Sequence, residues 1–144
     1  MKVLIQRVKS ARVTVDNNIV SSIGNGMLIF LGISNDNSRE DIIKMTNKIS
    51  KLRIFNDVNH IMNKNINEVN GEVLVVSQFT LYGDVKKGNR PSYIEAAKPD
   101  IANPIYNVVI EELDNLISNK VQSGIFGAYM IVDIVNDGPV TLII

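Results

Sequence analysis

The apolar run Val73–Val76 continues directly into the more polar stretch Ser77–Tyr82, with no turn residue between them. β-branched residues favour a buried strand, and the preceding Asn70-Gly71 pair is typical of a tight hairpin turn. We therefore expect a strand that begins at about Glu72. Because side chains alternate along a strand, its continuation would carry polar groups on one face and mostly apolar groups on the other.

That alternation has two explanations. The alternation places Gln78, Thr80 and Tyr82 on one face of the expected strand. It places Ser77, Phe79 and Leu81 on the other face. Either the stretch is an edge strand whose polar side lies in water, or the polar side chains belong to a site. The stretch alone does not separate the two.

In the first third of the chain, apolar segments separated by turn residues predict short strands joined by tight turns. Their ranges are Lys2–Val8, Ala11–Val15, Ile19–Ile23 and Met27–Ile33. The last of them is almost continuously apolar, which is typical of a central strand covered on both faces. Short connections between successive strands favour antiparallel pairing.

Two amphipathic helices are expected. The first begins at Ser38, with Asp41 placed for a capping box, and carries apolar residues at helical spacing as far as Leu52. The second is expected to be capped by Asp100, with Pro104 in or just before its first turn. Its predicted buried face comprises Ile105, Val108, Val109, Leu113, Leu116 and Ile117.

The remaining segments are predicted to be a helical turn over Ser92–Ala97, a strand near Phe126–Val135, a turn at Asn136–Pro139 and a last strand. The expected fold is α+β: a β-rich, barrel-like or two-sheet domain, antiparallel or mixed, with two main helices packed on it. The 144 residues suit one domain, 1–144.

Composition narrows the possible functions. The chain has no cysteine, so disulfides, thiolate nucleophiles and cysteine zinc sites are excluded. No apolar stretch approaches the roughly 20 residues that span a bilayer, and Met1–Arg7 is too short and polar for a signal peptide. We expect a cytoplasmic protein, not bound to membranes, with no metal and no cofactor.

The single histidine, His60, lies in an asparagine-rich segment that is typical of a loop. A serine–histidine–aspartate triad would need it, and no orienting carboxylate on a rigid element is near it in the sequence. With a formal net charge of zero, the protein has no extended positive electrostatic potential to attract nucleic acid, and we expect no DNA binding. Any RNA contact must therefore come from a small local cluster.

One candidate for such a cluster is the loop Gly83–Ser92. Its Lys86, Lys87 and Arg90 would suit phosphate groups, and its glycines allow close approach of the backbone. A plain solvent loop explains the same residues equally well.

The corner Asn136–Thr141 has an ordinary explanation as a turn. However, a Gly-Pro bond adopts the cis form at a cost of only about 0.5–1 kcal/mol. A cis Gly138-Pro139 bond would point two carbonyl groups to the same side.

Four segments together resemble the D-aminoacyl-tRNA deacylases, the D-tyrosyl-tRNA deacylase family. They are Ile5–Val8 with Ala11, Val75–Leu81, Lys87–Ser92 and Asn136–Thr141. The resemblance spans the chain in order and at compatible spacing, and two long motifs in a chain of this length make it specific.

The resemblance implies a homodimeric enzyme that hydrolyses the ester between a D-amino acid, or mischarged glycine, and the 3′ end of tRNA. It implies that Ser77, Gln78, Phe79 and Thr80 line the pocket. It also implies that Gly138 and Pro139, joined by a cis bond, enter the active site of the partner subunit.

An activated ester needs mainly a well-placed nucleophile and donors aimed at the oxyanion. Backbone N–H groups near Phe79 and Thr80 suit that role, and the ribose 2′-hydroxyl is placed to help activate water. Thr80 is either a nucleophile or a positioning group, and we favour the second because no base accompanies it. Carbonyls of Gly138 and Pro139 would hold the α-amino group and exclude L side chains sterically, which leaves glycine accepted.

Two other functions stay open at this point. One is a non-catalytic module on the same scaffold that binds the tRNA end or mediates dimerisation. The other, less favoured, is a triad hydrolase that depends on His60.

Overall fold

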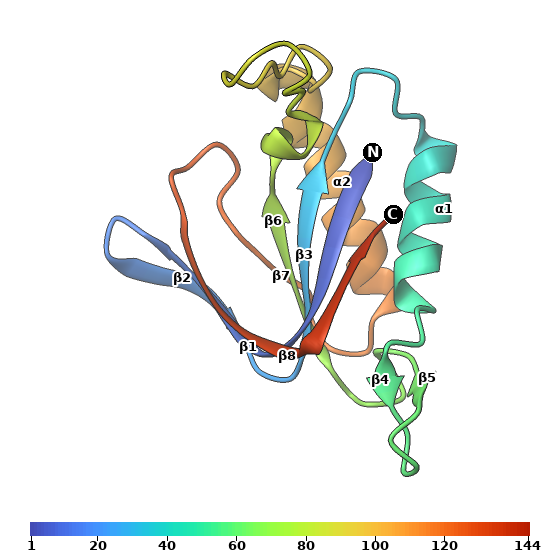
Figure 1. Cartoon of the computed structure of the whole chain (residues 1–144). Helices are drawn as coiled ribbons and strands as arrows, with labels where there is room; N and C mark the ends of the chain where they lie inside the picture. The colour runs from blue at the N-terminus through green and yellow to red at the C-terminus, as the bar shows by residue number, and fades with distance from the viewer.

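A sheet of six strands forms the body of the protein in the computed structural model, which describes residues 1–144 (Figure 1). Its order is β2-β1-β3-β6-β7, and β8 pairs with β1 as well. The strands are β1 (Lys2–Val15), β2 (Asn18–Ile23), β3 (Gly26–Gly32), β6 (Glu72–Ser77), β7 (Gln122–Ser123) and β8 (Ile131–Ile143). The expected β-rich α+β fold, with a nearly barrel-like sheet, is confirmed.

β1 is one continuous strand where two were expected. Its first half pairs antiparallel with β3, as in Lys2 opposite Gly32, and its second half with β2, as in Ala11 opposite Ile23. Figure 1 shows β1 and β8 bending together where the two halves meet. The predicted turn before β2 is confirmed, since Asp16 and Asn17 both have positive φ angles, 48° and 62°.

The expected hairpin at Asn70-Gly71 is wrong. Asn70 does have a positive φ of 48°, but β6 pairs parallel with both β3 and β7. Because a parallel partner requires a long crossover, the chain passes through a helix and a small hairpin before β6 begins. At the start of this pairing a Cβ on Gly26 would lie 1.8 Å from the Glu72 carbonyl oxygen, so only glycine fits there.

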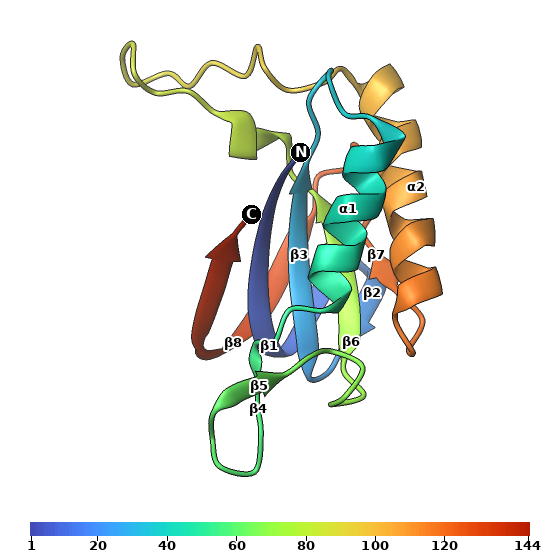
Figure 2. The same ribbon diagram turned by 90° about the vertical axis from the view of Figure 1, so that its right-hand side faces the viewer.

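Two helices, α1 (Arg39–Ser50) and α2 (Pro99–Leu116), cover one face of the sheet, as Figure 2 shows. They bury the larger core, in which Ile5, Ile29 and Val75 of the strands meet Ile49 and Leu113 of the helices. The predicted capping box is confirmed: the Asp41 N–H donates to Ser38 Oγ, and the Ser38 N–H donates to the Asp41 carboxylate.

The start of α2 differs from the prediction. The N-cap is Lys98 and Pro99 occupies the first turn, so Asp100 is not the cap and Pro104 lies inside the helix. The expected helical turn over Ser92–Ala97 is wrong: a single turn, from the Ala96 N–H to the Tyr93 carbonyl, is all that forms. The buried face of α2 comprises Ala102, Tyr106, Val109 and Leu113, two of which were predicted.

β8 also differs, because the predicted turn at Asn136–Pro139 lies within the strand. The segment stays beside β1, and register shifts between Gln6 and Ser10 of β1 absorb the irregular backbone. A separate hairpin, β4 (Phe55–Asn56) with β5 (Met62–Lys64), extends below the sheet in Figure 1. No helix of the protein is both long and apolar enough to cross a membrane.

Candidate active site

The stretch after β6 is not the extended strand that the sequence suggested. β6 ends at Ser77, and Phe79–Tyr82 forms a short 3₁₀ helix, η1. The Gln78 N–H donates to the Leu31 carbonyl at 2.8 Å, which ties the chain to the end of β3 before it turns. A Cβ on Gly32 would lie 3.1 Å from the Gln78 carbonyl oxygen, so the glycine leaves room for η1 to close over β3.

η1 presents polar groups and an aromatic ring to solvent. The Gln78 side-chain amide donates to Thr80 Oγ1, and both Phe79 and Thr80 are exposed. The Phe79 ring meets Tyr93 edge to face, with the ring centroids 5.1 Å apart. The N–H groups of Phe79 and Thr80 open the 3₁₀ helix and so have no acceptor within it.

A cleft of about 580 Å³ lies beside this segment. Of the four residues that the resemblance implies for the pocket, Ser77, Gln78 and Phe79 line this cleft, whereas Thr80 is not among the lining residues. Its other walls are mainly apolar and come from the end of β3, the loop before α2, the start of α2 and the loop before β8: Leu31, Ile33, Tyr93, Ala102, Phe126, Ala128, Tyr129 and Met130. These walls were not predictable from the sequence, because they come from segments that only the fold brings together.

The Gly138-Pro139 bond is cis, and both residues are exposed. The motif lies beside the start of β3, since Asp137 contacts Arg7 and Arg7 is paired with Met27. The cleft lies at the end of β3, where Leu31 is paired with Ser77. Along the strand these points are about 13 Å apart, and neither Gly138 nor Pro139 lines the cleft of its own chain.

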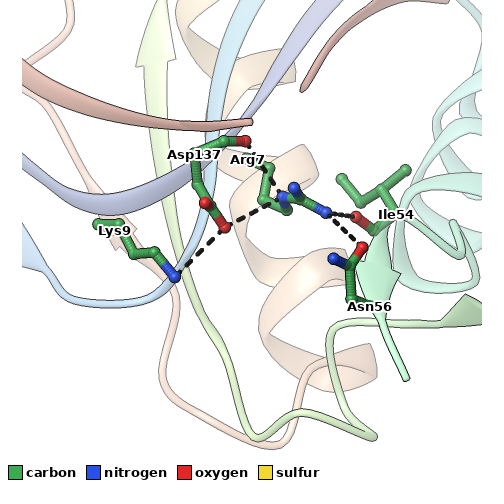
Figure 3. A network of polar contacts seen from close by, with 5 residues as sticks. All are labelled: Arg7, Lys9, Ile54, Asn56 and Asp137. Atoms are coloured by element: carbon green, nitrogen blue, oxygen red, sulfur yellow. Dashed lines mark hydrogen bonds and ion pairs between the residues drawn. The ribbon is translucent and has the colours of Figure 1, made fainter. Parts of the chain in front are cut away.

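A buried arginine holds the Gly-Pro segment against the body of the protein (Figure 3). Arg7 Nε donates to the Asp137 carbonyl at 3.2 Å and forms an ion pair with the Asp137 carboxylate at 3.2 Å. Its Nη1 donates to the Ile54 carbonyl at 2.7 Å and to Asn56 Oδ1 at 3.2 Å, while Lys9 lies 3.5 Å from the same carboxylate. The sequence analysis gave Arg7 no role of its own; an arginine between apolar strand residues was the available signal.

The other sequence candidates lie outside the cleft. Lys86, Lys87 and Arg90 are exposed on the loop above η1, which is closed by a bridge between Asp84 and Ser92. His60 is exposed between β4 and β5, with a positive φ of 62°.

These observations first define a class. An apolar cleft of this size, beside a 3₁₀ helix whose first N–H groups have no acceptor within the helix, is typical of a small-ligand site at which main-chain N–H groups can donate hydrogen bonds. No histidine, cysteine or carboxylate is among the residues that line the cleft.

Comparison with known proteins then defines the family. The model of the family described as D-Tyr-tRNA(Tyr) deacylase matches residues 4–144. The chain is 54% identical to the D-aminoacyl-tRNA deacylase of Flavobacterium psychrophilum and 52% identical to that of Thermosipho africanus, covering 100% of this chain and 96% of each relative. The chain therefore belongs to the D-Tyr-tRNA(Tyr) deacylase family, a family of hydrolases.

Solved structures agree with this fold. One, named c-Myc DNA Unwinding Element Binding Protein, superposes with a TM-score of 0.94 at 40% identity, over 100% of this chain and 97% of its own. Another, described as "a probable eukaryotic D-amino acid tRNA deacylase", gives 0.84 at 17% identity over 99% and 97% of the two chains, a similarity of fold alone.

Proposed function

We propose that this protein hydrolyses the ester bond of D-aminoacyl-tRNA, and of glycyl-tRNA that is mischarged, and releases the free amino acid and tRNA. The observation that carries the proposal is the cleft at the end of β6, which Ser77, Gln78 and Phe79 line and beside which the 3₁₀ helix η1 begins with unpaired backbone N–H groups. Relatives about half identical over the whole chain are named D-aminoacyl-tRNA deacylase. A substrate of translation also places the protein in the cytoplasm.

In the proposed reaction, water attacks the ester carbonyl carbon, and the bond between that carbon and the 3′ oxygen of the ribose breaks. The N–H groups of Phe79 and Thr80 donate to the oxyanion as it forms. The ribose 2′-hydroxyl, next to the ester, accepts a proton from the water, and a proton returns to the departing 3′ oxygen. An activated ester needs little more than this placement.

Thr80 acts here as a positioning group. Its hydroxyl oxygen already accepts a hydrogen bond from the Gln78 amide, and no histidine or carboxylate contacts it. A threonine without a base is a weak nucleophile. Thr80→Ser and Thr80→Val separate the roles: a positioning role predicts that Thr80→Val keeps measurable turnover, whereas complete loss in Thr80→Val with full activity in Thr80→Ser would indicate a nucleophile.

The position of Gly138-Pro139 supports a site shared between two subunits. The motif is exposed and lies about 13 Å along β3 from the cleft of its own chain, so a role at the active site requires the cleft of a second copy. β8, which carries the motif, exposes four large apolar side chains, Ile131, Ile134, Val135 and Ile143, and such a surface suits a homodimer interface.

Chiral selection would then follow from the shared site. Carbonyl groups of Gly138 and Pro139 from one subunit would hold the α-amino group and leave no room for an L side chain, so selection is steric. Glycine has no side chain to exclude. Lys86, Lys87 and Arg90 remain candidates for contacts with the RNA.

Mixed dimers test the shared site. Gly138→Ala alters the motif, because the φ of +124° and a Cβ 2.9 Å from Val140 leave no space for alanine. Ala128→Trp fills the cleft. If the site is shared, random mixing of these two inactive variants restores about a quarter of the wild-type activity, since half of the dimers contain one intact site.

Absence of any recovery, in mixed dimers shown to form by mass spectrometry, would contradict the shared site. A monomer in light-scattering measurements would contradict it as well. Binding of D-aminoacyl-tRNA by the wild type without turnover would replace the proposed enzyme with a binding module.

A further inference from the structure

Four cationic side chains gather along α1 and just beyond its end. Lys44, Lys48 and Lys51 follow one another at spacings of four and three residues, so they share one side of the helix, and Arg53 comes two residues later. All four are exposed. We call these residues the α1 basic face.

The α1 basic face keeps an excess of positive charge, although Asp41 interacts electrostatically with Lys44. None of its members forms an ion pair; the four ion pairs of the protein use Arg7, Lys9, Arg12 and Arg39. The four cations line a shallow groove of about 910 Å³ between α1 and the ends of β1 and β8, in which Asp41 is the one acidic side chain. Asp41 is already engaged by Ser38 in the capping box.

Helix stability explains only part of this arrangement. Cations in the last turn of a helix interact favourably with its dipole, which accounts for Lys48 and Lys51. It does not account for Lys44 in the middle of α1; Arg53, beyond the end of the helix, donates from Nε to the Asn63 carbonyl of β5 at 2.7 Å, which leaves its other guanidinium donors for a ligand. The chain has 15 basic and 15 acidic residues, so the four clustered cations form a local excess of positive charge.

The α1 basic face also ends beside the Gly-Pro motif of its own chain. Arg7 joins the two, because its guanidinium binds Asp137 on one side and the Ile54 carbonyl on the other, as Figure 3 shows. Arg53 directly precedes Ile54, and Asp137 directly precedes Gly138. The end of α1 and the motif are thus linked through one buried side chain, so a molecule bound at the motif lies close to the end of α1.

We propose that the α1 basic face binds backbone phosphates of the tRNA whose 3′ end occupies the cleft of the partner subunit. The inference rests on the proposed function, in which the motif enters that cleft. A tRNA strand leaving the cleft then passes the adjoining cations, and phosphates supply the complementary charge. Because such contacts are independent of base sequence, they would position many tRNAs alike.

Two substrates test the phosphate contacts. D-aminoacyl-tRNA carries phosphates, whereas D-aminoacyl-adenosine occupies only the cleft. In the variant Lys44→Gln/Lys48→Gln/Lys51→Gln we expect a higher KM for the tRNA substrate, the same kcat, and unchanged hydrolysis of the adenosine ester. The slope of log Kd for tRNA against log salt should fall by about 2, as expected for three lost contacts to a single strand.

Lys120→Gln, which removes an exposed lysine after α2, outside the α1 basic face, is the control for loss of a surface charge and should leave both measurements unchanged. Equal tRNA kinetics and salt slopes in the triple variant and the wild type would overturn the inference and leave the proposed function standing. Failure of the wild type to hydrolyse either ester would overturn the proposed function, while the salt slope of tRNA binding would still test the α1 basic face.

Mixed dimers test whether the contact crosses between subunits. One subunit has a working cleft, and the other carries Ala128→Trp. We expect a raised KM when the lysine substitutions are on the Ala128→Trp subunit and a normal KM when they are on the subunit with the working cleft. The reverse pattern would show that the face serves its own cleft and would contradict the proposal.

Discussion

Replacing Arg7 with methionine should both destabilise the protein and disturb the Gly-Pro motif. The arginine side chain is only 8% exposed, while the Asp137 carboxylate is 30% exposed. Methionine would leave the Ile54 carbonyl without its 2.7 Å donor and Asp137 with only the distant Lys9.

The magnitude follows from those contacts. Breaking a fully buried ion pair costs about 3–5 kcal/mol, and a hydrogen bond to a charged group is worth about 1.5–3 kcal/mol. Because water partly screens Asp137, we expect Arg7→Met to lower the free energy of unfolding by about 3 kcal/mol. Arg7→Lys keeps the charge but cannot bridge Asp137 and Ile54, so its cost should be smaller, about 1–2 kcal/mol.

Lys9→Met is the control, because Lys9 faces the same carboxylate from a 60% exposed position. It should cost about 0–1 kcal/mol. Urea unfolding measures all three variants, and ester hydrolysis at a temperature where each is folded measures the motif. Equal destabilisation by Arg7→Met and Lys9→Met would refute the reasoning, as would full activity and D-selectivity in folded Arg7→Met.

Three further predictions concern single side chains. His60→Ala should leave the hydrolysis rate unchanged, because His60 is exposed and does not line the cleft; a large loss of rate would revive the triad hypothesis. Hydrogen bonds from the Ser38 N–H and hydroxyl hold the pKa of Asp41 below 3.8, so its contribution to stability is present above that pH and is lost as the pH falls below it. Thermal melts should therefore show a smaller loss of stability on acidification in Asp41→Asn than in the wild type, and equal losses would contradict this cause. Tyr106→Phe removes a buried hydrogen bond of 2.8 Å to the Val75 carbonyl and should lower the free energy of unfolding by about 1 kcal/mol in urea titrations; no change would indicate that the bond contributes nothing net.

Local signals in the sequence predicted the elements whose cause is itself local. The Ser38–Asp41 capping box, the turn at Asp16-Asn17 and the apolar run of β3 were all predictable, because each depends on residues next to one another. The α+β class followed from their order along the chain.

Elements set by distant partners were not predictable in this way. Side-chain alternation continues through Ser77, but the tie from the Gln78 N–H to Leu31 and the space left by Gly32 turn the chain into η1. Likewise Asn70-Gly71 has the chemistry of a hairpin, yet β6 pairs parallel with β3. Tertiary packing overrides local pattern at both points.

In the candidate site, too, some residues were predictable from local sequence and others depend on distant partners. Ser77, Gln78 and Phe79 could be selected as candidates from the sequence, because they adjoin one strand end, and they lie together along one cleft. The role of Arg7 depends on Asp137, which is 130 residues away, so no local pattern could reveal it.

The most direct test of the account is the release of amino acid from D-aminoacyl-tRNA and from its L counterpart, measured side by side with the purified protein. The account predicts rapid hydrolysis of the D ester alone. Equal hydrolysis of both esters would contradict steric selection by Gly138 and Pro139, and hydrolysis of neither, with tRNA still bound, would contradict the proposed enzyme.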